Sequence, residues 1–102
     1  MIAYIAGAIS DNPNYEYDFA DCEMVLKHMG RTVLSPTHTP LGLSWEDYMK
    51  IDKVLLEIAD EVFFLDGWKK SKGAKIEHEW AKQSNKKIYY YSKDKLIVRN
   101  EW

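Results

Sequence analysis

The chain has 102 residues, of which 46% are hydrophobic and 29% are charged, and its formal net charge is −2. This length and composition predict one soluble globular domain over residues 1–102 with a modest core, and they exclude a disordered chain. A slightly acidic chain also lacks the basic face that is usual in a nucleic-acid binder, so no nucleic-acid polymer is expected as a partner.

The cysteine content and the apolar runs indicate in which cellular compartment the protein is expected. The single cysteine, Cys22, excludes an intrachain disulfide and a zinc cluster of cysteines, and its place in a helical pattern predicts a buried structural thiol. The N-terminus has no basic region followed by a long apolar run, and no apolar run approaches the length of a membrane span. We therefore expect a cytoplasmic protein with no membrane partner.

Short apolar segments alternate with segments in which apolar residues recur at helical spacing. In chain order these predict a strand at 2–6, a helix at 15–29, a strand at 31–35, a helix at 45–59, a strand at 61–65, a helix at 72–84 and a strand at 86–91. The stretch from residue 92 to the end is expected to add either an edge strand or an arm to a neighbouring subunit.

The helix expected at 45–59 has a clear start and a clear apolar face. Ser44 is a good N-cap residue with an acidic residue, Asp47, three positions later. The apolar stripe has four members: Tyr48, Ile51, Leu55 and Ile58. This stripe places Asp52 at the border of the apolar face.

Strands that alternate with helices predict right-handed crossovers and a parallel α/β sheet covered on both faces. The strands are almost continuously apolar, as buried parallel strands are. Ligands of such sheets bind beyond the carboxyl ends of the strands. Three predicted loops lie at that end: 7–14, 35–43 and 66–73.

Glu77 is the carboxylate that fits its predicted helix least well. It shares one side of the helix with three small residues: Ala74, Ala81 and Ser84. A carboxylate on a core-facing stripe is unusual. Two interpretations stay open: an exposed glutamate or one paired with a lysine, and a carboxylate that points from the helix into the ligand crevice.

Asp52 is a second carboxylate in an unusual place, and it is either a boundary residue in water or a partner for Glu77 across the crevice. Paired carboxylates cleave glycosidic bonds, because one attacks or stabilises the anomeric carbon and the other handles the proton. His28, His38 and His78 are not spaced as metal ligands, so neither a metal nor another cofactor is expected. His38, in the second loop, is a candidate ligand contact.

Backbone amides and lysines at the ligand end suit an anionic or hydroxylated ligand. Gly7 ends the first strand in a turn whose free N–H groups would hold a phosphate or a sugar hydroxyl, although a tight turn explains the glycine equally well. The lysine-rich segment 69–72 at the head of the third helix is either a solvated loop or an anion-binding element.

Three motifs in this order resemble the nucleoside 2-deoxyribosyltransferase-like superfamily, over roughly residues 2–90. They are "YIAGAIS" at 4–10, a Phe-Leu-Gly-Val-Pro pattern between Phe19 and Pro36, and the long segment 47–81 with "GW-x-x-S-x-G-A-x-x-E". The most similar branch is a group of small bacterial and phage-type proteins. The resemblance implies a flavodoxin-like or Rossmann-like three-layer sandwich with four or five parallel strands in the order 2-1-3-4.

The resemblance also implies roles for individual residues. Glu77, four residues after Gly73, matches the nucleophile; Asp52, eight residues before Asp60, matches the catalytic aspartate; and Tyr4, three residues before Gly7, matches an active-site tyrosine. The implied substrate contacts are Gly7, Ala8, Ile9, Ser10, Ser71, Gly73 and Ala74. In relatives a neighbouring subunit completes the site from its C-terminal region, which implies a homo-oligomer.

Two positions depart from the transferase pattern. Ser71 stands where transferases carry aspartate, and related 2′-deoxynucleoside 5′-monophosphate N-glycosidases have a serine there that helps hold the phosphate. Glu79 stands where the family often has glycine. The implied activity is cleavage of the N-glycosidic bond of a nucleoside or nucleotide by hydrolysis or base transfer. Two alternatives stay open: a nucleotide-binding, sensing or sequestering protein without activity, and an interaction domain with an empty pocket.

Overall fold

Four parallel strands and three helices alternate along residues 1–92, which are the residues that the computed structural model describes. The strands and helices in chain order are β1 (Ile2–Ala6), α1 (Tyr15–His28), β2 (Thr32–Leu34), α2 (Trp45–Ile58), β3 (Glu61–Leu65), α3 (Lys72–Gln83) and β4 (Lys87–Tyr91). Two short 3-10 segments, η1 (Pro36–His38) and η2 (Trp68–Lys70), lie in predicted loops. The prediction for the end of the chain falls outside the described residues, apart from Ser92.

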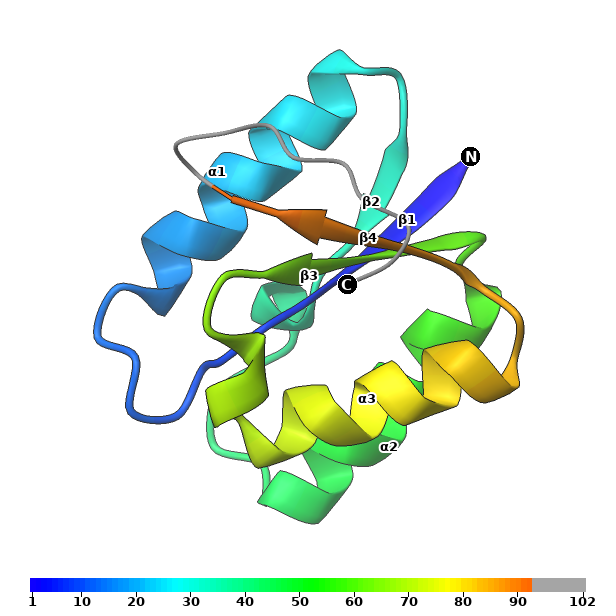
Figure 1. Cartoon of the computed structure of the whole chain (residues 1–102). Helices are drawn as coiled ribbons and strands as arrows, with labels where there is room; N and C mark the ends of the chain where they lie inside the picture. Colours follow the sequence, from blue (N-terminus) through cyan, green and yellow to red (C-terminus); the bar gives the residue numbers. More distant parts are fainter. Residues whose placement is uncertain (93–102) are drawn as a thin grey trace.

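The sheet has the strand order β2-β1-β3-β4, with every neighbouring pair parallel. This confirms the predicted α/β class and the predicted order 2-1-3-4. In the register, Tyr4 of β1 lies opposite Val62 of β3, and Phe64 of β3 lies opposite Tyr90 of β4. Helix α1 covers one face of the sheet, and α2 and α3 lie together on the other (Figure 1).

Alternating side chains of β1 explain why the sheet has a core on each face. Ala3 and Ile5 pack with Phe19 and other residues of α1, whereas Tyr4 and Ala6 pack on the side of α2 and α3. All residues of β3 are buried, as expected for a central strand covered on both faces. The sheet therefore directs the Tyr4 ring toward α3.

The predicted apolar stripe of α2 is correct only in part. Tyr48, Ile51 and Leu55 are half-buried, and Leu55 packs against the core, but Ile58 is 53% exposed. The fully buried residues of α2 are Asp52 and Leu56. The helix is rotated about its axis relative to the prediction because it packs beside α3 as well as on the sheet. Asp52 consequently lies on the buried face and not at its border. Ser84, which was placed on the buried side of α3, is the exposed C-cap residue.

An ion pair links the residue before β2 to the first residue of β3, at the amino ends of the strands and away from the predicted ligand loops. The Nε of Arg31 lies 2.7 Å from Oε1 of Glu61, and the guanidinium makes a second contact at 3.3 Å. Glu61 is only 1% exposed, so its charge depends on this one partner for compensation within the described residues. The paired carboxylate raises the pKa of Arg31 further.

We expect Arg31→Met to lower the free energy of unfolding by about 3–5 kcal/mol, because it leaves a buried carboxylate without its partner. Urea denaturation at pH 7 measures this. The double variant Arg31→Met/Glu61→Leu should recover much of the loss. As a control, Lys27→Met removes the ion pair of a 59%-exposed lysine and should cost less than about 1 kcal/mol. Equal losses in the two single variants would contradict this interpretation.

Candidate functional site

A cavity of about 210 Å³ opens at the carboxyl ends of the strands, where the sequence predicts ligand binding. All three predicted loops contribute to it. The loop residues that line it are Gly7, Ile9, Ser10, Pro36, Thr37, Thr39, Leu41 and Ser71. The helix residues that line it are Tyr15, Trp45, Tyr48, Met49, Asp52, Gly73, Ala74 and Glu77. The cavity wall thus carries both of the carboxylates that the sequence singles out.

Glu77 is buried in that wall and is hydrogen-bonded to Tyr4 of strand β1. Its side chain is 4% exposed, and Oε2 accepts a hydrogen bond from the hydroxyl of Tyr4, which is itself fully buried. The small residues Ala74 and Ala81 flank Glu77 on the same side of α3, and both are buried. They let the helix lie close enough to the sheet for this short carboxylate to reach a strand residue. The structure therefore brings Tyr4 and Glu77 together, as the sequence predicts.

Burial changes the proton affinity of this pair. The pKa of Glu77 is raised from 4.5 to about 8, because loss of water and the nearby charge of Asp52 raise it by more than the hydrogen bond from Tyr4 lowers it. Burial also raises the pKa of Tyr4 well above its usual value, with Glu77 and Asp52 adding to the effect. Tyr4 is therefore a neutral hydrogen-bond donor, and Glu77 is a carboxyl group whose ionisation is disfavoured.

Asp52 completes the group of buried acids. It is 8% exposed, it lines the cavity, and burial raises its pKa from 3.8 to about 6. Within residues 1–92 its buried Oδ1 atom has no hydrogen-bond partner. A buried polar atom without a partner is costly and is a frequent mark of a functional site. The structure thus favours the interpretation of Asp52 as a partner for Glu77 across the crevice.

The head of α3 forms one rim of the cavity. Ser71 is the N-cap residue, and its hydroxyl accepts a hydrogen bond of 3.2 Å from the Ala74 N–H. The Ser71 hydroxyl can still donate its own proton to a ligand, whereas the Ala74 N–H would have to exchange Ser71 for the ligand. A Cβ atom on Gly73 would lie 3.2 Å from Sδ of Met49, so a larger residue there would require the Met49 side chain to shift where α3 packs beside α2. Nearby, the ammonium group of Lys72 lies 4.9 Å from the centre of the Trp45 ring.

Gly7 allows the end of β1 to pack closely against the end of β3. A Cβ atom at this position would lie 3.1 Å from the Leu65 side chain at the end of β3. Gly7, Ile9 and Ser10 line the cavity, whereas Ala8, which was named with them, is not among the lining residues. The same is true of Tyr4, which reaches the site only through Glu77.

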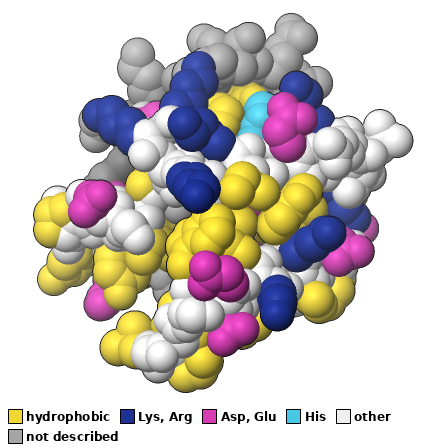
Figure 2. All heavy atoms as spheres, turned by 90° about the horizontal axis from the view of Figure 1, so that it is seen from below, with side chains coloured by type: hydrophobic (Ala, Val, Ile, Leu, Met, Phe, Trp, Pro, Cys, Tyr) yellow, Lys and Arg dark blue, Asp and Glu magenta, His cyan; other side chains and the backbone are white. Residues whose placement is uncertain are grey.

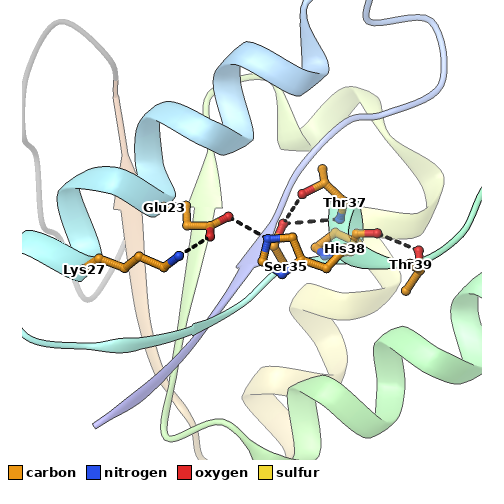
Figure 3. A network of polar contacts seen from close by, with 7 residues as sticks. Glu23, Lys27, Ser35, Thr37, His38 and Thr39 are labelled. Carbon is orange, nitrogen blue, oxygen red and sulfur yellow. Dashed lines mark hydrogen bonds and ion pairs between the residues drawn. The ribbon is translucent and has the colours of Figure 1, made fainter.

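The opposite wall is the segment around η1, which hydrogen bonds keep in shape (Figure 3). Ser35 accepts from the Thr37 N–H and lies 2.7 Å from the Thr37 hydroxyl, and the Thr39 hydroxyl donates to the Pro36 carbonyl at 2.7 Å. His38, predicted as a candidate ligand contact, does not line the cavity. Its Nε2 lies 3.0 Å from Oε1 of Glu23 in α1.

The aromatic part of the cavity was not predicted from the sequence. Tyr15, Trp45 and Tyr48 lie in the first turns of α1 and α2, and all three line the cavity. Tyr48 also fixes the loop before α2, because its hydroxyl donates to the Pro40 carbonyl at 2.8 Å. The sequence feature that could have predicted this lining is the presence of aromatic residues in the first turn of each helix that follows a predicted ligand loop.

Seen from below, on the side of α2 and α3, apolar side chains gather at the centre of the molecule, with basic and acidic side chains around them (Figure 2). Among residues 1–92, no group of three or more His, Cys, Asp or Glu side chains is arranged to hold a metal ion. Within the same residues, no helix has both the length and the apolar character needed to cross a bilayer.

The strand order and the arrangement of the helices define the fold of the chain. The chain has the fold of nucleoside 2-deoxyribosyltransferases and nucleotide N-glycosidases. It belongs to the family described as "Domain of unknown function (DUF4406)", whose family model matches residues 1–90. No curated protein is similar enough in sequence to match.

Three solved structures share the fold at low sequence identity. The CMP N-glycosidase BcmB of Clostridium botulinum is 21% identical, with a TM-score of 0.69 over 90% of this chain and 71% of that one. A 2-deoxyribosyltransferase of Bacillus psychrosaccharolyticus is 21% identical, with a TM-score of 0.72 over 97% and 77%. A 2-deoxyribosyltransferase of Leishmania mexicana is 18% identical, with a TM-score of 0.70 over 89% and 63%.

The raised pKa of Glu77 predicts a loss of stability at higher pH. The folded protein binds this proton more tightly than the unfolded chain, whose carboxyl has a pKa near 4.5. The free energy of unfolding should therefore fall as the pH rises from about 5 to about 8, by up to about 1.4 kcal/mol per pH unit. Asp52 acts in the same direction at the lower end of this range.

Urea denaturation at several pH values measures this, with Glu77→Gln as the variant that cannot ionise. We expect the stability difference between the wild type and this variant to change by several kcal/mol over the range. Glu79→Gln is the matched control, because Glu79 is exposed on the same helix. A difference that is constant with pH would contradict the raised pKa.

Proposed function

We propose that this protein cleaves the N-glycosidic bond of a (deoxy)nucleoside or nucleoside 5′-monophosphate, by hydrolysis or by transfer of the base. The observation that carries this proposal is the buried Glu77 in the wall of the cavity, bonded to Tyr4 and accompanied by Asp52. The names of the structural relatives support it, because they describe a CMP N-glycosidase and 2-deoxyribosyltransferases.

In the proposed reaction, Glu77 is the nucleophile. Its carboxylate oxygen forms a bond to C1′ while the bond from C1′ to the base nitrogen breaks, and the electron pair leaves with the base. Asp52 supplies a proton to the departing base. Water or a second base then attacks C1′ of the glycosyl ester and gives up a proton to Asp52, while the bond from C1′ to the Glu77 oxygen breaks and Glu77 leaves as a carboxylate. Tyr4 orients the carboxylate through its hydrogen bond.

The two carboxyl groups together hold the number of protons that this reaction needs, and the reaction requires the shared proton to move from Glu77, whose pKa is the higher, to Asp52. Their pKa values of about 8 and about 6 mean that the pair holds roughly one proton over the neutral range. The first step needs one carboxylate and one carboxylic acid, so the pair then has the required number of protons. Because the two charges interact, the two titration steps belong to the pair as a unit.

The loop contacts favour a nucleotide over a nucleoside. Ser71 and Gly73 lie at the positive end of α3, where an anion is stabilised by the helix dipole. Together with the Ala74 amide and the first-loop residues Gly7, Ala8, Ile9 and Ser10, they are the proposed substrate contacts. The aromatic wall of Tyr15, Trp45 and Tyr48 suits the flat face of a base.

We further propose a cytoplasmic homo-oligomer. The single cysteine, Cys22, is a buried free thiol, as is usual in proteins of a reducing compartment. Val54 and Ile58 on the outer side of α2 are more than half exposed, and contact with a second copy would cover them. Light scattering of the purified protein measures the mass of the assembly.

One observation favours a nucleotide-binding protein without activity as the second candidate. A carboxyl with a pKa of about 8 is mostly protonated at neutral pH, and a protonated carboxyl is a poor nucleophile. Such a protein would bind a nucleotide in the same cavity and leave its N-glycosidic bond intact.

Release of free base separates the two candidates. We expect the wild type to release base from a mixture of deoxynucleosides and nucleotides, and Glu77→Gln to lose at least about a thousandfold of that activity because it removes the nucleophile. Chromatography of the mixture after incubation measures the base. Glu79→Gln is the matched control and should remain active.

Tight binding of a nucleotide without base release, at saturating protein, would contradict the enzyme and favour the second candidate. A protein that neither binds nor cleaves any of these compounds would contradict both. Isothermal titration calorimetry measures the binding.

Ser71 provides a test of the nucleotide preference. Aspartate is as good an N-cap as serine, so Ser71→Asp should preserve α3 while it places a negative charge at the rim. We expect kcat/KM for a nucleoside 5′-monophosphate to fall by about tenfold to a hundredfold, with little change for the nucleoside. Steady-state kinetics with both substrates measures the ratio.

Ser44→Asp is the control for this substitution, because Ser44 caps α2 through the Asp47 N–H at 3.1 Å and does not line the cavity. An equal change for nucleoside and nucleotide in Ser71→Asp would contradict a phosphate contact at this rim.

A further inference from the structure

Two consecutive residues of α3 make hydrogen bonds to strands on opposite sides of β3. Glu77 accepts from the Tyr4 hydroxyl of β1, and Nε2 of His78 lies 2.8 Å from the Tyr90 hydroxyl of β4. Tyr4 and Tyr90 belong to the same core cluster, on the face of the sheet that α3 covers. The rotation of α3 about its own axis is therefore fixed from both sides.

His78 also contacts the segment that leads into α3. Its ring stacks on Trp68 of η2, with ring centres 4.3 Å apart and planes 19° apart, and it meets the edge of Phe64 at 4.9 Å. Trp68 is 7% exposed and stands three residues before Ser71, which lines the cavity. One imidazole thus joins the helix, the edge strand and the loop at the rim of the cavity.

Such a contact is needed because burial destabilises the ionised form of Glu77. If α3 turned about its axis far enough to expose the carboxylate to water, the ionised carboxylate would become more stable, so ionisation favours that rotation. Burial lowers the pKa of His78, as do Lys82 and Lys69, while Glu79 raises it. The imidazole is consequently neutral at neutral pH, and its hydrogen bond to Tyr90 opposes the outward rotation.

We propose that His78 is a positioning residue, which keeps the Glu77 carboxylate at the cavity wall through its hydrogen bond to Tyr90 and its stacking on Trp68. The kinetic consequence rests on the proposed function, in which Glu77 is the nucleophile. The geometric consequence, that the environment of Glu77 depends on His78, can be measured whether or not the protein turns over a substrate.

Two substitutions separate the hydrogen bond from the ring. His78→Phe preserves an aromatic ring on Trp68 and removes the nitrogen that meets Tyr90. His78→Gln places an amide nitrogen near the position of Nε2 and removes the ring. Tyr90→Phe removes the hydroxyl from the other side and serves if a histidine variant does not fold. Glu79→Gln is the control for a charge change on the same helix.

The first measurement is the titration of the Glu77 side chain by carbon-13 NMR. In His78→Phe we expect its pKa to fall from about 8 toward 4.5, because the carboxyl gains water when α3 is free to turn. In His78→Gln and Glu79→Gln the pKa should stay near the wild-type value. An unchanged pKa in both His78→Phe and Tyr90→Phe would overturn the proposal.

The second measurement is the steady-state release of base. We expect kcat of His78→Phe to fall by about tenfold to a hundredfold with little change in KM, because a displaced nucleophile affects the transition state more than binding. His78→Gln should retain kcat within about threefold. Equal losses in both variants, in proportion to their loss of thermal stability, would overturn the proposal in favour of simple packing.

The two measurements distinguish this inference from the proposed function. If the wild type releases no base and the Glu77 pKa still falls in His78→Phe, the proposed function fails and the positioning role stands. If base release by the wild type depends on Glu77 and the Glu77 pKa is unchanged in His78→Phe and Tyr90→Phe, the positioning role fails and the proposed function stands.

Discussion

The hydrogen bond between Tyr4 and Glu77 is the interaction on which the site depends. A carboxyl group can lie on the core side of a helix only if a donor meets it there, and the fully buried Tyr4 hydroxyl is that donor. The bond joins the first strand to the third helix, which are far apart in the sequence. It also requires α3 to lie close to the sheet, which the small residues Ala74 and Ala81 allow.

The remaining features of the cavity follow from this close approach. Gly73 permits α3 to cross Met49 of α2, so the two helices share one face of the sheet. Asp52 is thereby buried near Glu77, and its charge disfavours the ionisation of Glu77 together with the loss of water. The free energy spent on burying acids appears as raised pKa values, which is the usual origin of acid and base groups that work near neutral pH.

The elements of this fold were predictable because each carries a strong local signal. The strands at 2–6 and 61–65 are short apolar runs bounded by loops, and the structure confirms both. Ser44 and Ser71 mark helix starts, and both accept the capping hydrogen bond. The rotation of α2 was not predictable, because it depends on the neighbouring helix and sheet as well as on the helix's own pattern.

By itself, the sequence determined the order of strands and helices, the parallel sheet and the end of the sheet where the cavity lies, since periodicity and crossover handedness are local properties. It also marked Glu77 as a carboxylate on a core-facing stripe. Only the tertiary structure decided that Asp52 is buried, that His38 does not line the cavity and that His78 meets Tyr90. These outcomes depend on contacts between elements that are distant in the chain, and a helical pattern does not specify how far a helix turns when it packs.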